Sequence, residues 1–209
     1  AISNFGPVGL TILKVATSNN QIIWAGSQNV LYKTSNGGST WNTISLPFMA
    51  FLNSVAIDAS NPNNVWVCFG GYFTGQKVYK TTDGGSTWTN ISAGNLPNVN
   101  CNTIVHQTGS NGGVYVGTDI GVYYYDENIQ NWTFFSNGLP NVVIDELEIH
   151  YGSGKLRAAT YGRGLWETSL FNPASTSPVA NFTANDLAGC PGFSVQFTDQ
   201  STNNPTSWN

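Results

Sequence analysis

The 209-residue sequence has a formal net charge of −4, and only 9% of its residues are charged. Its 23 glycines and few charged residues are typical of a protein of strands and turns, not of a helical or disordered one. With Arg157 and Arg163 as its only arginines, the chain has no basic stripe for a phosphate backbone, which argues against a nucleic-acid partner. Its longest apolar runs have strand length, well short of the roughly 20 residues of a membrane-spanning helix.

Partial alternation of apolar and polar residues predicts an all-β fold in which groups of four short strands repeat. We expect the first group at residues 10–16, 21–26, 30–35 and 41–45, and the second at 53–58, 65–69, 77–82 and 88–92. The third is expected at 101–106, 113–118, 121–126 and 132–136. The fourth, at 143–150, 155–160 and 164–170, stops before an outer strand. Pro47, Pro97 and Pro140 mark the crossings between groups, because proline cannot continue a ladder.

Two hairpins in these groups, residues 31–45 and 78–92, have nearly the same sequence. Both fit the pattern Ser/Thr-x-Asp/Asn-x-Gly-x-Thr-Trp, with Thr34, Asn36, Gly38, Thr40 and Trp41 in the first and Thr81, Asp83, Gly85, Thr87 and Trp88 in the second. We expect the Asp83 side chain to bond backbone N–H groups two residues on, and the glycines to take positive φ. The tryptophan then anchors each hairpin in the core.

A third copy of the hairpin, residues 122–132, is degenerate. It aligns without gaps, but Tyr125, Glu127 and Ile129 stand in place of Thr81, Asp83 and Gly85. Its Trp132 continues the spacing set by Trp41 and Trp88, which is close to the roughly 40 to 45 residues of a propeller blade. We therefore predict that this hairpin keeps its tryptophan anchor and loses the turn chemistry.

The hairpin pattern resembles the Asp-box, also called the BNR repeat, of sialidases, xyloglucan-cleaving glycosidases and sortilin receptors. Those families are β-propellers, so the resemblance implies a propeller of about four blades at residues 1–171 but no particular activity. Ala1-Ile2-Ser3 matches the outer-strand ends Ile44-Ser45 and Ile91-Ser92. We expect it to be the tail of a further blade in a larger propeller, because three residues bury too little to close a four-bladed ring.

The composition changes after Phe171. Residues 172–177 form a Pro/Ser/Thr linker, which is extended and poor in apolar side chains. Residues 178–209 resemble the first strands of a PKD domain, an immunoglobulin-like sandwich that needs roughly 100 residues to be complete. A propeller followed by a PKD domain resembles cargo of the type nine secretion pathway, which implies a secreted or cell-surface bacterial protein and the secretion machinery as a partner.

In propeller families, ligands bind the face that carries the loops between strands two and three of each blade. Here those loops include residues 70–76, 117–121 and 160–164, and their ligand candidates are Tyr72, Phe73, Gln76, Asp119, Tyr161 and Arg163. Aromatic rings offer apolar contacts to a sugar ring, and Gln76 and Asp119 can bond hydroxyl groups. In the alternative interpretation, Tyr72 and Phe73 only pack their loop and Arg163 pairs with a carboxylate.

Carboxylates near a propeller channel can act as acid and base in glycoside hydrolysis, and Asp145, Glu146 and Glu148 begin an innermost strand. No partner carboxylate from another blade can be assigned, and two arginines cannot form the arginine triad of sialidases. We therefore expect solvated charges and no catalytic residue.

Asp58, His106 and His150 occupy one repeat position, which favours a structural role in turns over a metal site. Neither a metal nor a cofactor is expected. The three cysteines show no C-x-x-C spacing. Cys68 and Cys101 are either buried free thiols or a mutual disulfide, and Cys190 is expected to pair outside this chain.

These observations favour a non-enzymatic part of a secreted or surface-attached protein, in which the propeller binds extracellular glycan or a surface protein and PKD modules act as spacers. Two alternatives remain. The chain is a fragment of a polysaccharide hydrolase whose active-site blades lie upstream, or it has a purely structural or adhesive role without a small ligand.

Overall fold

The computed structural model describes residues 9–172, 180–185, 188, 192 and 194–201. The chain divides into two units, Ala1–Ser169 and Leu170–Asn209. All regular secondary structure in the described ranges is β-strand, which confirms the predicted all-β class. Those ranges contain no helix long and apolar enough to cross a membrane.

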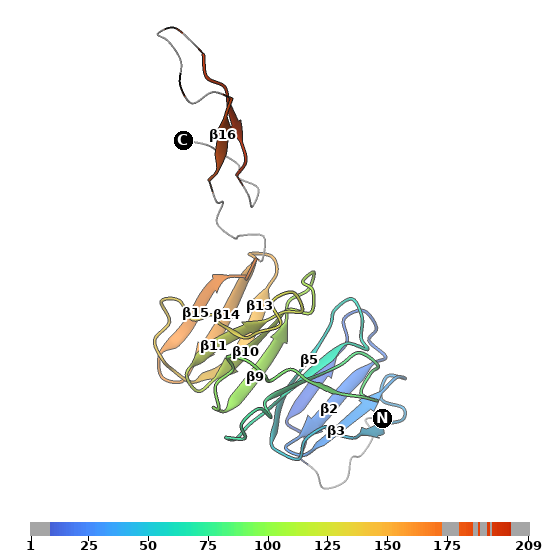
Figure 1. The fold of residues 1–209 in the computed structure, drawn as a ribbon. Helices are drawn as coiled ribbons and strands as arrows, with labels where there is room; N and C mark the ends of the chain where they lie inside the picture. Colours follow the sequence, from blue (N-terminus) through green and yellow to red (C-terminus); the bar gives the residue numbers. More distant parts are fainter. Residues whose placement is uncertain (1–8, 173–179, 186–187, 189–191, 193, 202–209) are drawn as a thin grey trace. The chain divides into compact units, whose positions relative to one another are not determined.

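The first unit consists of four antiparallel sheets that follow one another along the chain (Figure 1). The first contains β1 (Ile12–Val15), β2 (Ile23–Ser27), β3 (Val30–Thr34) and β4 (Asn42–Ile44), and the second contains β5 (Leu52–Ile57), β6 (Val65–Phe69), β7 (Val78–Thr81) and β8 (Thr89–Asn90). The third contains β9 (Cys101–His106), β10 (Val114–Thr118), β11 (Gly121–Tyr125) and β12 (Thr133–Phe134). The fourth has β13 (Ile144–His150), β14 (Lys155–Thr160) and β15 (Gly164–Ser169).

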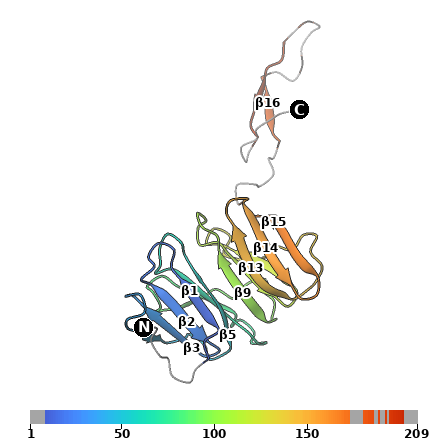
Figure 2. The same ribbon diagram turned by 180° about the vertical axis from the view of Figure 1, so that it is seen from behind.

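The first strands of successive sheets adjoin in the interior of the unit. β5 contacts β1, β9 contacts β5, and β13 contacts β9, and these strands can be followed from behind in Figure 2. Four-stranded sheets stacked through their inner strands are the blades of a β-propeller. The predicted propeller-type fold is therefore confirmed, and the sheets are called blades 1 to 4 from here on.

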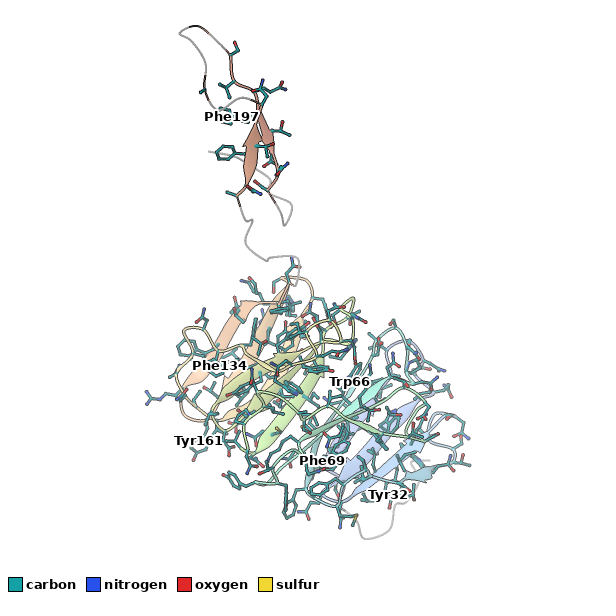
Figure 3. The ribbon with its side chains drawn as sticks, in the orientation of Figure 1. Tyr32, Trp66, Phe69, Phe134, Tyr161 and Phe197 are labelled. Atoms are coloured by element: carbon teal, nitrogen blue, oxygen red, sulfur yellow. The ribbon has the colours of Figure 1, made fainter. Side chains whose placement is uncertain are left out.

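The core lies between neighbouring blades, and β6 supplies both of its halves. Val67 and Phe69 belong to the cluster between blades 1 and 2, whereas Trp66 and Cys68 belong to the cluster between blades 2 and 3. Figure 3 labels Trp66 within the packed sheets. Because successive side chains of a strand point to opposite faces, a strand sandwiched between two blades must be apolar throughout.

Both cysteines of the described ranges are buried free thiols, so the disulfide alternative for Cys68 and Cys101 is wrong. Burial raises the pKa of the Cys101 thiol to about 12, and the thiol is therefore protonated at neutral pH. Cys190 lies outside the described residues, so its pairing stays a prediction.

The two regular hairpins are closed by side-chain bonds from the predicted positions. Asp83 Oδ1 accepts hydrogen bonds from the backbone N–H groups of Ser86 and Thr87 and from Thr81 Oγ1, at 2.9, 2.9 and 2.7 Å. In blade 1, Asn36 Oδ1 likewise accepts from the N–H of Thr40 at 2.9 Å. The bonded N–H groups lie three and four residues beyond the acceptor, not two as predicted, because two glycines widen the turn.

The glycines of these turns have the positive φ that the sequence predicted. Gly84 and Gly85 have φ of 70° and 96°, and Gly37 and Gly38 have φ of 66° and 92°. Residues with a Cβ rarely adopt this backbone region, so the glycine pair is what permits the turn.

Two of the three hairpin tryptophans tie their blade to the one before it, whereas Trp41 Nε1 donates to the Gly38 carbonyl oxygen of its own turn at 3.2 Å. Trp88 Nε1 donates to the carbonyl oxygen of Ser45 in blade 1 at 3.1 Å, and Trp132 Nε1 donates to that of Ile91 in blade 2 at 2.7 Å. Trp132 is fully buried, but Trp88 is only partly buried. Trp88 and Trp132 are thus connections between blades as well as parts of their own hairpins.

The third hairpin departs from the prediction that its turn chemistry is lost. Asp126, one position before the aligned Glu127, accepts hydrogen bonds from the N–H groups of Asn128 and Ile129 at 2.9 and 2.8 Å. Its other oxygen accepts from the Tyr124 hydroxyl at 3.1 Å. Glu127 instead pairs with Lys80 Nζ of blade 2 at 2.7 Å. The turn is therefore capped by a shifted acceptor, and the aligned residue has become a link between blades.

The Asp83 turn makes stability depend on pH. Hydrogen bonds from Thr87, and further ones from Thr81 and Ser86, hold the pKa of Asp83 well below its ordinary value. A carboxylate with a depressed folded-state pKa stabilises the fold above its unfolded pKa of about 4, and this contribution is lost as the pH falls through the folded pKa. We expect Asp83→Asn to flatten the decline of unfolding free energy below about pH 4, measured by urea titration. Glu167→Gln serves as the control, and an unchanged acid slope in Asp83→Asn would contradict the expectation.

The described part of the second unit is one antiparallel pair, β16 (Phe182–Ala184) and β17 (Phe197–Asp199). The rings of Phe182 and Phe197 lie 5.4 Å apart, and both are exposed. Most of the predicted linker and the N-terminal Ala1-Ile2-Ser3 lie outside the described residues. The PKD resemblance and the domain limits stay predictions.

Candidate functional site

The turns that join the second and third strands of the blades lie at one end of the sheets, together with the connection from blade 1 to blade 2. We call this surface the loop face. It comprises residues 28–29, 45–51, 70–77, 119–120 and 161–163. All six predicted ligand candidates lie on it.

Tyr72 and Asp119 are brought together from two blades. The Tyr72 hydroxyl in the β6–β7 loop donates to Asp119 Oδ2 in the β10–β11 turn at 3.3 Å. The other oxygen of Asp119 accepts from Asn102 Nδ2 at 3.2 Å. The carboxylate is thus oriented by its neighbours, while the Tyr72 ring stays largely exposed to solvent.

Lys77 underlies this pair and was not anticipated from the sequence. It is 1% exposed, its Nζ donates to the carbonyl oxygen of Gly71, and it lies 5.9 Å from the centre of the Tyr72 ring. Burial lowers the pKa of Lys77, although Cys101 and Asp119 oppose the shift. A lysine at the start of a strand is usually a surface charge, so only the folded loop reveals its position beneath the tyrosine.

The polar candidate Gln76 is engaged within its own blade, because its Oε1 accepts a hydrogen bond from the Tyr79 hydroxyl. Phe73 packs edge-on against Phe48 at 5.3 Å between ring centres and is still partly exposed. The interpretation of Phe73 as loop packing is therefore partly right, but one side of its ring faces solvent.

Phe73 also lines a hollow of about 230 Å³ whose other apolar walls are Met49, Ala50 and Phe51, with Gln28 and Asn29 at its rim. Met49 is 76% exposed and Phe51 is 57% exposed. Sequence reasoning missed both residues. The signal was the apolar run Phe48-Met-Ala-Phe51, which directly follows a proline in a connection where polar residues are usual.

Tyr161 and Arg163 lie on the β14–β15 turn of blade 4, and both are exposed. Figure 3 places Tyr161 at the margin of the packed sheets. The Arg163 carbonyl oxygen accepts from Trp166 Nε1 at 2.9 Å. In the described part of the chain, no hydrogen bond, ion pair or ring contact joins Tyr161 or Arg163 to the loop of Tyr72 and Phe73. The six candidates therefore form two groups, one on the β6–β7 loop and the β10–β11 turn and the other on the β14–β15 turn.

A second concave region runs between the inner strands β1, β5, β9 and β13. This axial groove of about 540 Å³ is lined by Glu146 and Glu148 of β13, Lys14 of β1 and His106 of β9, among others. Asp145 is exposed but does not line it. The two carboxylates come from one strand, and among the described lining residues no carboxylate from another blade faces them.

Two of the three residues at the equivalent repeat position have turn roles. Asp58 accepts from the N–H and the hydroxyl of Ser60 at 2.8 and 2.7 Å, and His150 Nδ1 lies 2.8 Å from Ser153 Oγ. His106 differs, because its ring stacks on Trp66 at 4.6 Å and burial lowers its pKa. Within the described ranges, no three potential metal ligands converge.

The fold and this site define a β-propeller-type protein with a loop face and an axial groove. No protein-family model matches the sequence, and no curated protein matches it either. Solved structures do resemble it.

The GH74 enzyme of Niastella koreensis superposes with a TM-score of 0.61 at 17% identity, over 78% of this chain and 23% of that one. An auxiliary nutrient binding protein of Bacteroides thetaiotaomicron gives 0.61 at 14% identity, over 77% of this chain and 38% of that one. YCF48 bound to D1 peptide gives 0.55 at 20% identity, over 76% of this chain and 54% of that one. At these identities the likeness shows the fold alone, and this chain spans only part of each of these proteins.

Proposed function

We propose that this chain is a non-enzymatic binding portion of a secreted or cell-surface multidomain bacterial protein, and that its loop face binds glycan or protein. The observation that carries the proposal is the cluster of exposed apolar side chains Met49, Phe51 and Phe73 around a hollow, with the exposed Tyr72 next to Phe73 in the same loop. Contiguous exposed apolar surface with a polar rim is a hallmark of interaction sites, since it is otherwise a liability in water.

The chemistry of this cluster suits a ligand with an apolar face and nearby hydroxyl or amide groups. The Tyr72 ring offers a flat apolar surface. The neighbouring Asp119 carboxylate, which the Tyr72 hydroxyl orients, can accept hydrogen bonds, and the side-chain amides of Gln28 and Asn29 can donate or accept them. Such a combination of apolar walls and few polar groups is typical of binding pockets.

The rest of the proposal extends the resemblances in the sequence. Side-chain bonds from Asp83 and Asn36 close the two regular hairpins, which supports the proposal that they are Asp-boxes. We further propose that β16 and β17 belong to a PKD spacer in cargo of the type nine secretion pathway. Two of the similar structures, an auxiliary nutrient binding protein and the extracellular domain of another Bacteroides thetaiotaomicron protein, support the proposal of an extracellular location.

A second candidate function is supported by the axial groove and by the GH74 enzymes among the similar structures. In this alternative, the chain is part of a polysaccharide hydrolase, and Glu146 and Glu148 face a sugar chain. Hydrolysis needs an acid and a second carboxylate at a suitable distance across the bond, and one strand alone supplies both here. We therefore expect no release of reducing sugar from xyloglucan or other β-glucans. Turnover that disappears in Glu146→Gln would replace the binding proposal with this one.

Binding at the loop face is tested with the triple variant Phe51→Ala, Tyr72→Ala and Phe73→Ala on glycan arrays and peptide-display libraries. We expect affinity for any ligand found to fall at least about tenfold, equivalent to about 1.4 kcal/mol, because the apolar contact surface is removed. Phe134→Ala, which removes an exposed aromatic ring from the outer strand β12, is the matched control. Variants at Tyr161 and Arg163 then tell whether blade 4 contributes. Unchanged affinity in the triple variant would remove the loop face from consideration.

A further inference from the structure

His106, the last residue of β9, packs its ring between blades 2 and 3 without a hydrogen bond. The ring lies nearly flat on that of Trp66 in β6 (Figure 3), with 4.6 Å between the ring centres and 13° between the planes. Among the described residues, four buried side-chain nitrogens lack a hydrogen-bond partner, and three of them are Nδ1 and Nε2 of His106 and Nε1 of Trp66. Buried polar groups are usually paired, so this contact depends on stacking and burial instead.

The carboxylate of Asp58 in blade 2 lies close to this ring but is already engaged. Its Oδ1 is 4.0 Å from His106 Nδ1, which is beyond hydrogen-bonding distance. The same oxygen accepts from the N–H and the hydroxyl of Ser60, and Oδ2 accepts from Asn64 Nδ2 at 3.1 Å. A proton on His106 would therefore be attracted to Asp58, but the ring would gain no hydrogen bond where it now lies.

A second cation already lies near the ring on which His106 stacks. Lys80 Nζ of β7 is 5.4 Å from the centre of the Trp66 ring and is paired with Glu127 of blade 3. A charged imidazole on Trp66 would meet this like charge, which offsets the cation–π attraction that the indole offers. The axial groove beside His106 adds exposed charges that solvent screens, those of Glu146, Glu148 and Lys14.

These surroundings make the charged form of His106 unfavourable in the folded protein. Burial is the main cause that lowers its pKa, Asp58 opposes the shift, and Lys80 adds to it. A histidine in an unfolded chain has a pKa of about 6.5, so the unfolded state takes up this proton first as the pH falls. The free energy of unfolding therefore declines below about pH 6.5, and this decline is complete once the pH has passed below the folded-state pKa.

We propose that His106 makes the contact between blades 2 and 3 acid-sensitive: its uncharged ring seals the contact at neutral pH, and a proton drives the ring off Trp66 toward Asp58 and water. The contact with blade 4 at the same residue is of another kind. Tyr151 donates its hydroxyl to the His106 carbonyl oxygen at 3.2 Å and accepts from the N–H of Thr108 at 2.9 Å. Those backbone atoms do not titrate, so the contact with blade 4 persists when the ring leaves.

The two histidines of the chain, His106 and His150, allow a direct test by NMR. The 209-residue protein is titrated from about pH 8 to about pH 5, and the carbon-bound ring hydrogens are followed. We expect those of His106 to titrate with a midpoint below about 6.5. The ring-current shift that the stacked Trp66 imposes on them should be lost at the same midpoint. His150→Gln, on an exposed turn, should leave both changes in place.

The variant His106→Phe keeps a ring against Trp66 and removes the titrating group. Urea titrations of the wild-type protein should show a loss of stability between about pH 6.5 and about pH 5, and His106→Phe should abolish most of that loss. His150→Gln is again the control and should retain it.

A His106 midpoint below about 6.5, together with loss of the ring-current shift, supports the proposal. A midpoint at or above about 6.5 overturns it, and so does a protonated ring that keeps its ring-current shift. A pH-dependent loss of stability that His106→Phe leaves unchanged also overturns it. If His106→Phe does not fold, the NMR titration of the wild-type protein decides the question alone.

Discussion

Trp132→Ala is expected to lower the free energy of unfolding by about 3 to 5 kcal/mol, the range for large buried aromatic side chains. Trp132 is fully buried among residues of blades 2 and 3, its ring lies 5.3 Å from that of Tyr125, and its Nε1 donates to the Ile91 carbonyl oxygen at 2.7 Å. Alanine would leave a cavity and an unpaired carbonyl at the contact between the two blades. Urea titration followed by circular dichroism measures the loss.

Trp88→Ala is the matched comparison, because this ring makes the equivalent bond to blade 1 but is only partly buried. We expect it to cost clearly less than Trp132→Ala, since less apolar surface returns to water. Equal losses would contradict the expected dependence on burial, and a loss below about 1 kcal/mol for Trp132→Ala would show that this ring is not the anchor between blades.

The second large effect is expected for Asp126→Ala, at about 2 to 4 kcal/mol. Asp126 is 1% exposed, and its carboxylate accepts from the N–H groups of Asn128 and Ile129 and from the Tyr124 hydroxyl. Removing the acceptor leaves partly or fully buried donors without partners, and each such group costs about 1 to 3 kcal/mol. Thermal and urea unfolding give the difference.

Glu127→Ala is the control for Asp126→Ala. It breaks the ion pair with Lys80, but both side chains keep access to water, so we expect a loss within about 1 kcal/mol. If Glu127→Ala lowered the free energy of unfolding more than Asp126→Ala, Glu127 and not Asp126 would be the cap of this turn.

Strand positions were predictable because each depends on a local pattern. Alternation, glycine turns and inter-blade prolines placed all fifteen strands of the first unit, from β1 to β15, close to their observed limits. The position of the central strand β6 was equally predictable, since an unbroken apolar run indicates a strand that is covered on both faces.

The candidate site was predictable only in part. Tyr72 and Phe73 stood out because aromatic residues in a long loop are unusual, but Met49 and Phe51 join them only when the connection between blades 1 and 2 is folded beside that loop. Lys77 and Asp119 meet Tyr72 through contacts that span up to 47 residues of sequence. No local pattern encodes such distances.

Local sequence was enough to predict the repeat, the two regular hairpin turns and the order of strands within each blade, because these depend on residues within a few positions of one another. Only the folded structure shows that Asp126 replaces Glu127 as a cap, that Trp132 is more deeply buried than Trp88, and that Tyr72 reaches Asp119. The last two depend on which side chain a neighbouring blade brings within reach, and that is set by the packing of whole sheets against one another.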